Sequence, residues 1–410
     1  MLLKKLASYE NGLVVVLGLT FGVVFFDRGA IGVLMPFIVK DLHLTASQVG
    51  IVGGALSLTW AVANFLAGRA SDLSGRRKPL LIFALVAFSV CTIGSGLAGT
   101  FATLLAARLL MGAAQGPAAP LVMVLAAEGS SPARRGLNSG LIGSFNPLVA
   151  GVIGPVLLVS LAAAFGWRTT FFIAGIPGLV MAVVVTLFVR ETGAGRASAL
   201  AARANTMPVS DVLRTRNIWV CTLCCSCLAG YASLLMVFMP LYLVQTAHIE
   251  PAQIGVLLSI AGAGSLIAGN FTLALSDRVG HKPVVMAAGF AAIAAPLGVL
   301  FFADSLATLG LLLAIGMTAM FTMPLLFMAI PAGSLPAQSL GTAMGLITGV
   351  AEILGSAATP AISGWVTEYA GASAPFYICV GLALAWGSLA LLLRETRQFR
   401  APVPLAHLGG

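Results

Sequence analysis

Apolar runs separated by short polar breaks fill most of the 410-residue chain. Each run is about as long as the roughly 20 apolar residues that a helix needs to cross a bilayer, so each predicts a spanning helix. The predicted spans cover residues 12–38, 47–69, 79–98, 101–127, 137–165, 169–189, 217–246, 252–275, 283–302, 307–332, 341–366 and 375–393. The pattern therefore predicts an all-α membrane protein with twelve transmembrane helices.

One long polar stretch, rich in Ala, Arg and Ser, divides the chain near its midpoint. It predicts a linker between two six-helix bundles. We expect an N-terminal bundle over residues 1–189, a cytoplasmic linker over 190–216, a C-terminal bundle over 217–395 and a cytoplasmic tail over 396–410.

The two predicted bundles repeat residues at a near-constant spacing of 204 or 205 positions. The matches include Gln48-Val49-Gly50 with Gln253-Ile254-Gly255, Gly136 and Gly140 with Gly341 and Gly345, Pro155 with Pro360, and Arg190-Glu191-Thr192 with Arg394-Glu395-Thr396. Six spans separate the copies, so both halves enter the membrane in the same direction. This is the pattern of parallel repeats, which place a substrate site near the membrane midplane between two pseudo-symmetric halves.

The composition excludes a soluble protein of this length. Apolar residues make up 59% of the chain and charged residues only 9%, against about 25% charged residues in soluble domains. The lipid bilayer is therefore the expected main solvent. We find no catalytic triad, phosphate-binding loop or nucleotide motif, so the chain is not expected to be an enzyme.

The distribution of the 22 basic residues predicts the orientation. With the N-terminus inside, eighteen of them fall on cytoplasmic segments, Lys40 and Arg168 fall outside, and Arg28 and Arg108 lie within spans. Cytoplasmic loops are enriched in Lys and Arg, so both termini are expected in the cytoplasm of a bacterial-type inner membrane. The net charge of +9 is then a signal of topology and does not predict a nucleic-acid surface.

Two further patterns resemble a signal peptide and a metal site, but each has a simpler explanation. Lys4 and Lys5 before an apolar run resemble a signal peptide, but the run continues through Asp27 and Arg28 without a cleavage-like site, so we expect a retained first span. The cysteines at 221, 224, 225 and 227 open an apolar span. Cysteine there behaves as a small hydrophobic residue, so no metal site is expected.

A short basic loop after the second span carries the most specific motif. It reads Gly68-Arg-Ala-Ser-Asp72-Leu-Ser-Gly75-Arg76-Arg77, and a partial copy, Asp277-Arg278-Val-Gly280-His281-Lys282, follows the second span of the other half. The motif resembles the signature loop of the major facilitator superfamily, from which it departs at Leu73. The resemblance implies two pseudo-symmetric six-helix bundles and a gating role for Gly68, Asp72, Gly75, Arg76, Arg77, Asp277, Arg278 and Gly280.

Four ionisable side chains lie inside predicted spans: Asp27, Arg28, Arg108 and Glu352. Such residues are costly in a membrane and are functional candidates. Asp27 and Arg28 lie roughly 22–24 Å along the first span, slightly beyond its middle, and Glu352 lies about 17 Å into the eleventh. A guanidinium facing the centre could hold a carboxylate through paired donors. The alternatives are a structural Asp27–Arg28 pair, and a Glu352 that only bonds a neighbouring helix.

The segment from Phe26 to Pro36 resembles the first span of the anion:cation symporters within that superfamily, which carry an Asp-Arg pair followed by a proline. Pro240-Leu-Tyr242-Leu243 resembles a stretch of their seventh span. The resemblance implies that Arg28 binds a substrate carboxylate and that Asp27 couples protons. The branch usually has a glutamate where this chain has Gln115, which cannot titrate, so we expect Glu352 to take part in proton coupling.

Further polar residues complete the predicted site. Arg108 begins an Arg-x-x-x-Gly motif of the superfamily, and substrate contact and snorkelling to the membrane surface are both open to it. Gln115, Asn146 and Tyr231 are further candidates for the substrate-binding surface, and the repeat pairs Tyr231 with Asp27.

Together these patterns predict a monomeric secondary transporter that moves a small organic anion, such as a sugar acid or an aromatic or dicarboxylic acid, with protons. It would work by alternating access, driven by the proton gradient and without a cofactor. One alternative is a drug or metabolite efflux proton antiporter. Gly151-Val-Ile-Gly154-Pro155 begins like the antiporter motif, but Val-Leu-Leu-Val follows where a Gly-Gly pair is expected. The other alternative is a non-transporting membrane sensor.

Overall fold

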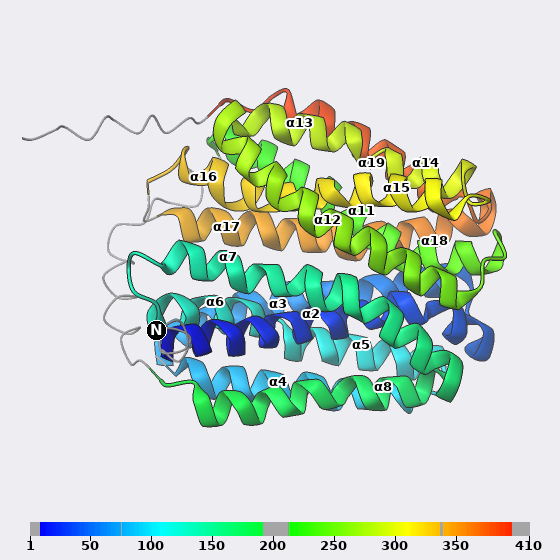
Figure 1. Cartoon of the computed structure of the whole chain (residues 1–410), viewed down its shortest axis with the longest axis horizontal. Coiled ribbons are helices and arrows are strands. Elements are labelled where there is room, and N and C mark those ends of the chain that lie inside the picture. The colour runs from blue at the N-terminus through cyan, green and yellow to red at the C-terminus, as the bar shows by residue number, and fades with distance from the viewer. Residues whose placement is uncertain (1–8, 75, 192–211, 213, 337–338, 396–410) are drawn as a thin grey trace, which may run out of the picture.

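The computed structural model describes residues 9–74, 76–191, 212, 214–336 and 339–395, with residues 67–74 described by their backbone alone. These residues form long helices that lie nearly parallel to one another (Figure 1). The first half comprises α2 (Tyr9–Leu42), α3 (Ala46–Ser74), α4 (Arg77–Gly96), α5 (Phe101–Gln115), α6 (Ala118–Gly129), α7 (Arg135–Asn146), the π-helical segment η1 (Pro147–Ile153) and α8 (Gly154–Phe188).

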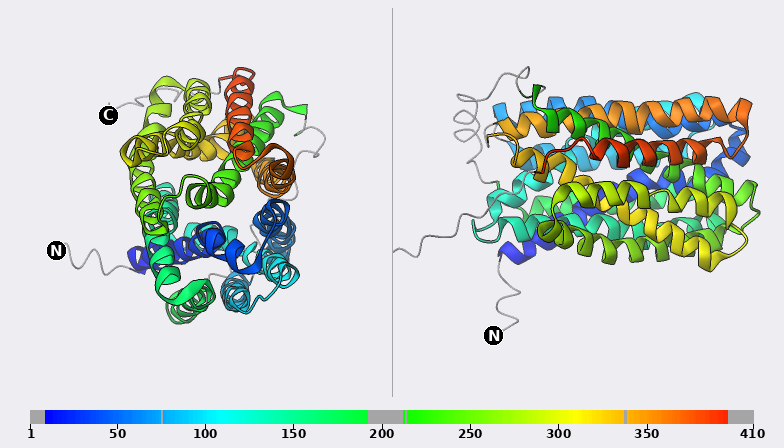
Figure 2. Two further views of the ribbon diagram at one scale, coloured as in Figure 1. Left: turned by 90° about the vertical axis from the view of Figure 1, so that its right-hand side faces the viewer. Right: turned by 90° about the horizontal axis from the view of Figure 1, so that it is seen from above.

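The second half repeats this plan. It comprises α11 (Arg216–Gln245), α12 (Pro251–Val279), α13 (His281–Ala291), α14 (Ala294–Phe301), α15 (Leu306–Thr318), η2 (Ala319–Thr322), η3 (Leu325–Ala329), α16 (Ile330–Ala332), α17 (Leu340–Val350), the π-helical segment η5 (Ala351–Ala358), α18 (Thr359–Ala370) and α19 (Ala374–Ala390). The two halves lie side by side, as Figures 1 and 2 show from three directions.

The described helices cover the predicted spans in order. Ten helical stretches are long and apolar enough to cross a membrane, and Ala374–Ala390 is a shorter apolar helix. One of the ten, Arg135–Phe188, is 54 residues long and reverses direction within α8 at Gly166, whose φ is 80°. It therefore accounts for two predicted spans, and the predicted count of twelve fits the fold.

Glycine makes the reversal possible because it has no Cβ to clash at positive φ. Gly371 has a φ of 89° between α18 and α19, and it is the repeat partner of Gly166. The two halves thus turn between their last two spans by the same device. The predicted linker lies mostly outside the described residues, so the predicted domain boundaries stay a prediction.

The buried apolar residues form two clusters, and their distribution distinguishes the two ends of the molecule. The basic end is the end at which α4, α7 and α13 begin, beside Arg76, Arg134 and Gly280. There the first half has a core of its own, which includes Leu17, Leu85, Leu125 and Val185. The other cluster includes Leu34 and Phe171 of the first half and continues into the second half through Leu235 and Leu258. One apolar core therefore joins the halves away from the basic end.

Candidate functional site

Small residues bring the two halves into direct backbone contact at the end opposite the basic end. A Cβ atom added to Gly54 of α3 would overlap the carbonyl oxygen of Ala357 in η5, and one added to Gly50 would overlap that of Pro360. On the other side of the molecule, a Cβ on Gly262 of α12 would overlap the backbone of Gly151 in η1. The interface is closed here because these positions lack side chains.

At the basic end, by contrast, glycines at equivalent positions of the two halves have no such contact. A Cβ atom added to Gly136, Gly140 or Gly143 of α7 would meet nothing within 4 Å. The same holds for Gly341, Gly345 and Gly349 of α17. Both halves thus present an uncovered stripe of glycines at the basic end, so the described part of the interface is closed at one end and open at the other.

Arg28 and Glu352 meet across this interface. Nη2 of Arg28, on α2, donates a hydrogen bond of 2.7 Å to Oε2 of Glu352, on η5. The Arg28 and Glu352 side chains are 17% and 9% exposed, respectively. The same Nη2 also donates to Oγ of Ser57 on α3 at 2.9 Å. Two predicted residues that are 324 positions apart therefore form one ion pair between the halves.

The surroundings of Arg28 orient its guanidinium. Its Cζ lies 5.3 Å from the ring centroid of Trp60 on α3, within the range of a cation–π interaction. Ser57 and Trp60 are three residues apart, so they share a helix face. Neither Ser57 nor Trp60 was predicted, because a serine and a tryptophan in an apolar span carry no signal that separates them from packing residues.

Glu352 lies on an irregular stretch of helix. π-Helical segments often occur at functional sites, and η1 occupies the matching place in the first half. Pro360 has no N–H, so the carbonyl of Ser356 one turn earlier loses its helical donor. Oγ of Ser233 on α11 donates to that carbonyl at 3.1 Å. The irregular helix is thus satisfied by its neighbour and holds Glu352 against α2.

Asp27 does not pair with Arg28, although the two are adjacent in sequence. Its Oδ2 accepts a 2.6 Å hydrogen bond from Oγ1 of Thr92 on α4, and the residue is only 1% exposed. Its Oδ1 has no hydrogen-bond partner. Neighbouring helix positions diverge by about 100°, so Asp27 faces the interior of the first half while Arg28 faces the second half. The structural Asp27–Arg28 pair is therefore not formed.

Arg108 is fully buried in the same interior region as Asp27. Its Nη2 donates to Oγ of Ser95 at 3.0 Å, and its Cζ lies 5.0 Å from the ring centroid of Phe171. Its Nε and Nη1 have no hydrogen-bond partner. Arg108 therefore does not snorkel to the surface, and it lies away from the Arg28–Glu352 pair.

The other predicted substrate-binding residues have separate positions. Gln115 is buried, and its Nε2 donates to the carbonyl of Val24 at 2.7 Å. Tyr231 is buried, and its hydroxyl donates to the carbonyl of Ala292 at 2.7 Å. Asn146 is half-buried at the end of α7. The hydrogen bonds of the Arg28 side chain go instead to Ser57 and Glu352, and the role of these three residues in substrate binding stays a prediction.

The predicted gating loops are described in part. Gly75 lies outside the described residues, and Gly68 and Asp72 are described by their backbone alone. Arg76 is exposed, and Arg77 forms an ion pair with Glu128 of α6. In the second copy, Asp277 and Arg278 lie in the last turn of α12, and Gly280 has a φ of 105°.

The two loops share a contact that was not predicted. The carboxylate of Glu191 accepts hydrogen bonds from the backbone N–H groups of Arg77 and Lys78, both at 3.0 Å. Glu395 accepts the equivalent bonds from His281 and Lys282 at 2.9 and 3.1 Å. A carboxylate at a helix N-terminus satisfies free donors and the helix dipole. The repeated Arg-Glu-Thr sequence was the signal that could have identified this contact.

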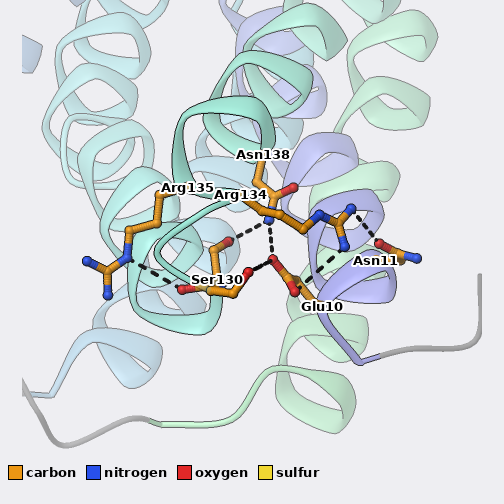
Figure 3. A network of polar contacts seen from close by, with 7 residues as sticks. Glu10, Asn11, Ser130, Arg134, Arg135 and Asn138 are labelled. Atoms are coloured by element: carbon orange, nitrogen blue, oxygen red, sulfur yellow. Dashed lines mark hydrogen bonds and ion pairs between the residues drawn. The ribbon is translucent and has the colours of Figure 1, made fainter. Parts of the chain in front are cut away.

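A further polar network ties the start of α2 to α7 and to the turn that precedes it (Figure 3). Oε1 of Glu10 accepts a 2.8 Å hydrogen bond from Nδ2 of Asn138, and Nη2 of Arg134 donates to Oδ1 of Asn11 at 2.9 Å. All of these residues belong to the first half. The network therefore joins elements within the first half and does not cross the interface between the halves.

The cysteine group contributes to packing. Cys221, Cys224 and Cys225 are buried within α11. Among the described residues, no group of three or more His, Cys, Asp or Glu side chains is placed to hold a metal ion.

Comparison with known proteins identifies the family. Residues 17–354 match the family model of the Major Facilitator Superfamily. The chain is 27% identical over 387 residues to the hexuronate transporter of Bacillus subtilis (strain 168), covering 90% of each protein. It is 25% identical over 292 residues to a Cupriavidus necator protein named "Probable sulfoacetate transporter SauU", covering 68% of this chain and 67% of that protein.

A solved structure has the same fold. The D-xylose-proton symporter superposes with a TM-score of 0.75 at 17% identity, covering 95% of this chain and 99% of that one. The helical repeats, the duplicated loops and the family match agree, and the protein belongs to the Major Facilitator Superfamily, whose members are transporters and not enzymes.

Proposed function

We propose that this protein moves small organic anions that carry a carboxylate, together with protons, by alternating access. The observation that carries the proposal is the contact between Arg28 and a carboxylate at the interface of the two halves. A guanidinium that holds the carboxylate of Glu352 at 2.7 Å has the geometry to hold one from a substrate. Hexuronate and sulfoacetate, named for two relatives, both contain a carboxylate.

The unequal ends of the interface support alternating access. The glycines at the end opposite the basic end are in backbone contact, while those of α7 and α17 are uncovered. Because basic loops favour the cytoplasmic side, this conformation opens toward the cytoplasm of a bacterial inner membrane. Rocking of the two repeats would close the basic end and open the other. A single chain contains both repeats and is proposed to act as a monomer.

Protons are the proposed driving force, and no cofactor is required. Asp27 and Glu352 are buried acids inside spans, and such acids form proton pathways in many transporters. Gln115 donates to a backbone carbonyl and carries no titratable proton. Proton coupling is therefore assigned to Asp27 and Glu352.

Uptake into proteoliposomes tests this function. The labelled probes are D-galacturonate, D-glucuronate, sulfoacetate and 3-phenylpropionate, each assayed with and without an imposed pH gradient. We expect at least one of these labelled anions to accumulate in response to the gradient. An excess of the same anion without label should inhibit uptake of the labelled one. Failure of all four carboxylates, or accumulation of neutral xylose in their place, would refute the proposal.

The alternative, a drug efflux antiporter, predicts a different result in the same vesicles. The antiporter-like segment at Gly151 and Pro155 contacts Gly262 and Gly255 of α12, so it forms part of the closed interface. An antiporter would expel an apolar cation such as ethidium when protons enter. Proton-driven ethidium movement without carboxylate transport would favour this alternative.

A further inference from the structure

The hydrogen-bond donors of Arg28 decide how a carboxylate can bind. A planar guanidinium grips a carboxylate through one of two forks, Nε with Nη2 or Nη1 with Nη2. Both hydrogens of Nη2 are already donated, one to Ser57 and one to Glu352. A substrate carboxylate can therefore become bidentate only if it displaces one of these two acceptors.

Charge favours displacement of Glu352. Two carboxylates beside one guanidinium would leave an uncompensated negative charge in a site where Glu352 is only 9% exposed, and like charges at short range disfavour the ionised forms. The hydroxyl of Ser57 is neutral and can remain. A displaced carboxylate that stayed ionised would be a buried charge without a partner, so displacement requires that Glu352 take up a proton.

We propose that Glu352 is an internal counter-ion, and that a substrate carboxylate replaces it on Arg28 only as Glu352 accepts one proton. The proposal rests on the proposed function and specifies how its site couples the two ligands. A monocarboxylate and one proton enter together, so the charge of the site is unchanged. When the substrate leaves, Glu352 releases the proton to water and pairs with Arg28 again.

Among the described residues, the ion pair of Glu352 is with Arg28. The neighbours of η5 on α11 include Ser226, Ala229 and Gly230, which pack beside Gly355. From α3, the residues at the pair are Ser57 and Trp60, and Trp60 lies against Arg28. Asp27 bonds Thr92 in the interior of the first half. Arg28 is thus the charged side chain that contacts Glu352.

The affinity for a transported anion, measured over a range of pH by equilibrium binding to the purified full-length protein, tests the exchange. The anion is whichever of the four probes the wild type accumulates. Because each bound carboxylate requires one proton, we expect the wild-type affinity to fall about tenfold per pH unit while Glu352 is ionised. The Glu352→Gln variant has no competing charge, so it should bind at alkaline pH as the wild type binds at acid pH.

A control variant assigns the proton to Glu352. Glu250→Gln makes the same chemical change at an exposed position before α12 and should keep the wild-type pH dependence. A pH dependence that persists in Glu352→Gln, or that disappears in Glu250→Gln, would overturn the proposal.

A measurement without substrate separates this proposal from the proposed function. Protonation of Glu352 leaves the Arg28 charge beside Trp60 uncompensated, so the fluorescence of Trp60 should change with pH. The contribution of Trp60 is the signal lost in Trp60→Phe, and its pH dependence should be absent in Glu352→Gln. If the Trp60 fluorescence changes with pH as expected but no anion is transported, only the proposed transport function is refuted. If the Trp60 fluorescence does not change with pH, or if the wild-type affinity for the anion does not depend on pH, the role of Glu352 as counter-ion is refuted.

Discussion

Asp27 and Arg28 are neighbours in sequence and have unrelated partners. Their depth and charge could be predicted from the apolar run around them, and so could the depth of Glu352. Their partners could not, because the Arg28 contact spans 324 residues and the Asp27 contact depends on Thr92, an ordinary residue in an apolar helix. Helix geometry alone separates their directions by about 100°. Which of those directions meets the second half depends on packing of the two halves.

The Arg28→Lys variant should lose transport although it keeps the charge. A lysine ammonium is a point donor and cannot form a fork with a carboxylate. Loss of one charge-assisted hydrogen bond is worth about 1.5–3 kcal/mol, so we expect the affinity for the transported anion to fall about 10- to 100-fold. Initial uptake rates over a range of anion concentrations provide the measurement.

The control for this variant is Arg214→Lys, at an exposed position before α11. Both variants should be expressed and elute like the wild type. Wild-type apparent affinity and rate in Arg28→Lys would remove Arg28 from the site.

At the scale of elements, the interface glycines have different surroundings at the two ends of the molecule. The repeat predicted that Gly140 and Gly345 correspond, but it could not predict that both are uncovered in this conformation. Backbone contact at Gly54 and open space at Gly345 both depend on the tilt between halves. The Gly166 and Gly371 turns are local, and the apolar pattern placed both between predicted spans.

Substitutions at these glycines should shift the conformational equilibrium in opposite directions. Gly54→Val adds atoms where Ala357 is already in contact, so it should open the closed end. Gly345→Val adds atoms at the open end and should hinder its closure. The readout is labelling of Asn146→Cys by a membrane-impermeant maleimide from the cytoplasmic side, which should decrease with Gly54→Val and not with Gly345→Val. Equal labelling in both variants would contradict the assignment.

The loop variants Gly75→Val and Asp72→Ala should slow turnover with little effect on substrate binding. Gly280, the repeat partner of Gly75, indicates why a glycine is needed in the loop. A Cβ atom on Gly280 would lie 2.8 Å from Oε2 of Glu395, and the Gly280 φ of 105° would be strained for any residue with a side chain. Turnover from uptake and affinity from equilibrium binding should be measured on the same preparations. Weakened binding with unchanged turnover would count against a gating role.

At the scale of the whole molecule, most of the fold could be predicted from the internal repeat. Twelve apolar runs and a constant offset predict two parallel bundles, because each run must bury its backbone in its own helix within lipid. The position of a site between the halves follows from that symmetry. The ion pair at this site is asymmetric: Arg28 belongs to one half and Glu352 to the other, so the repeat could not predict it.

The central claim is that anion and proton cross together. The most direct measurement is the internal pH of proteoliposomes, read with a trapped dye when the transported anion is added outside without an imposed pH gradient. The account predicts that the lumen acidifies as the anion enters, and that Arg28→Lys largely abolishes the signal. Alkalinisation on anion entry, or anion entry without any change in pH, would contradict it.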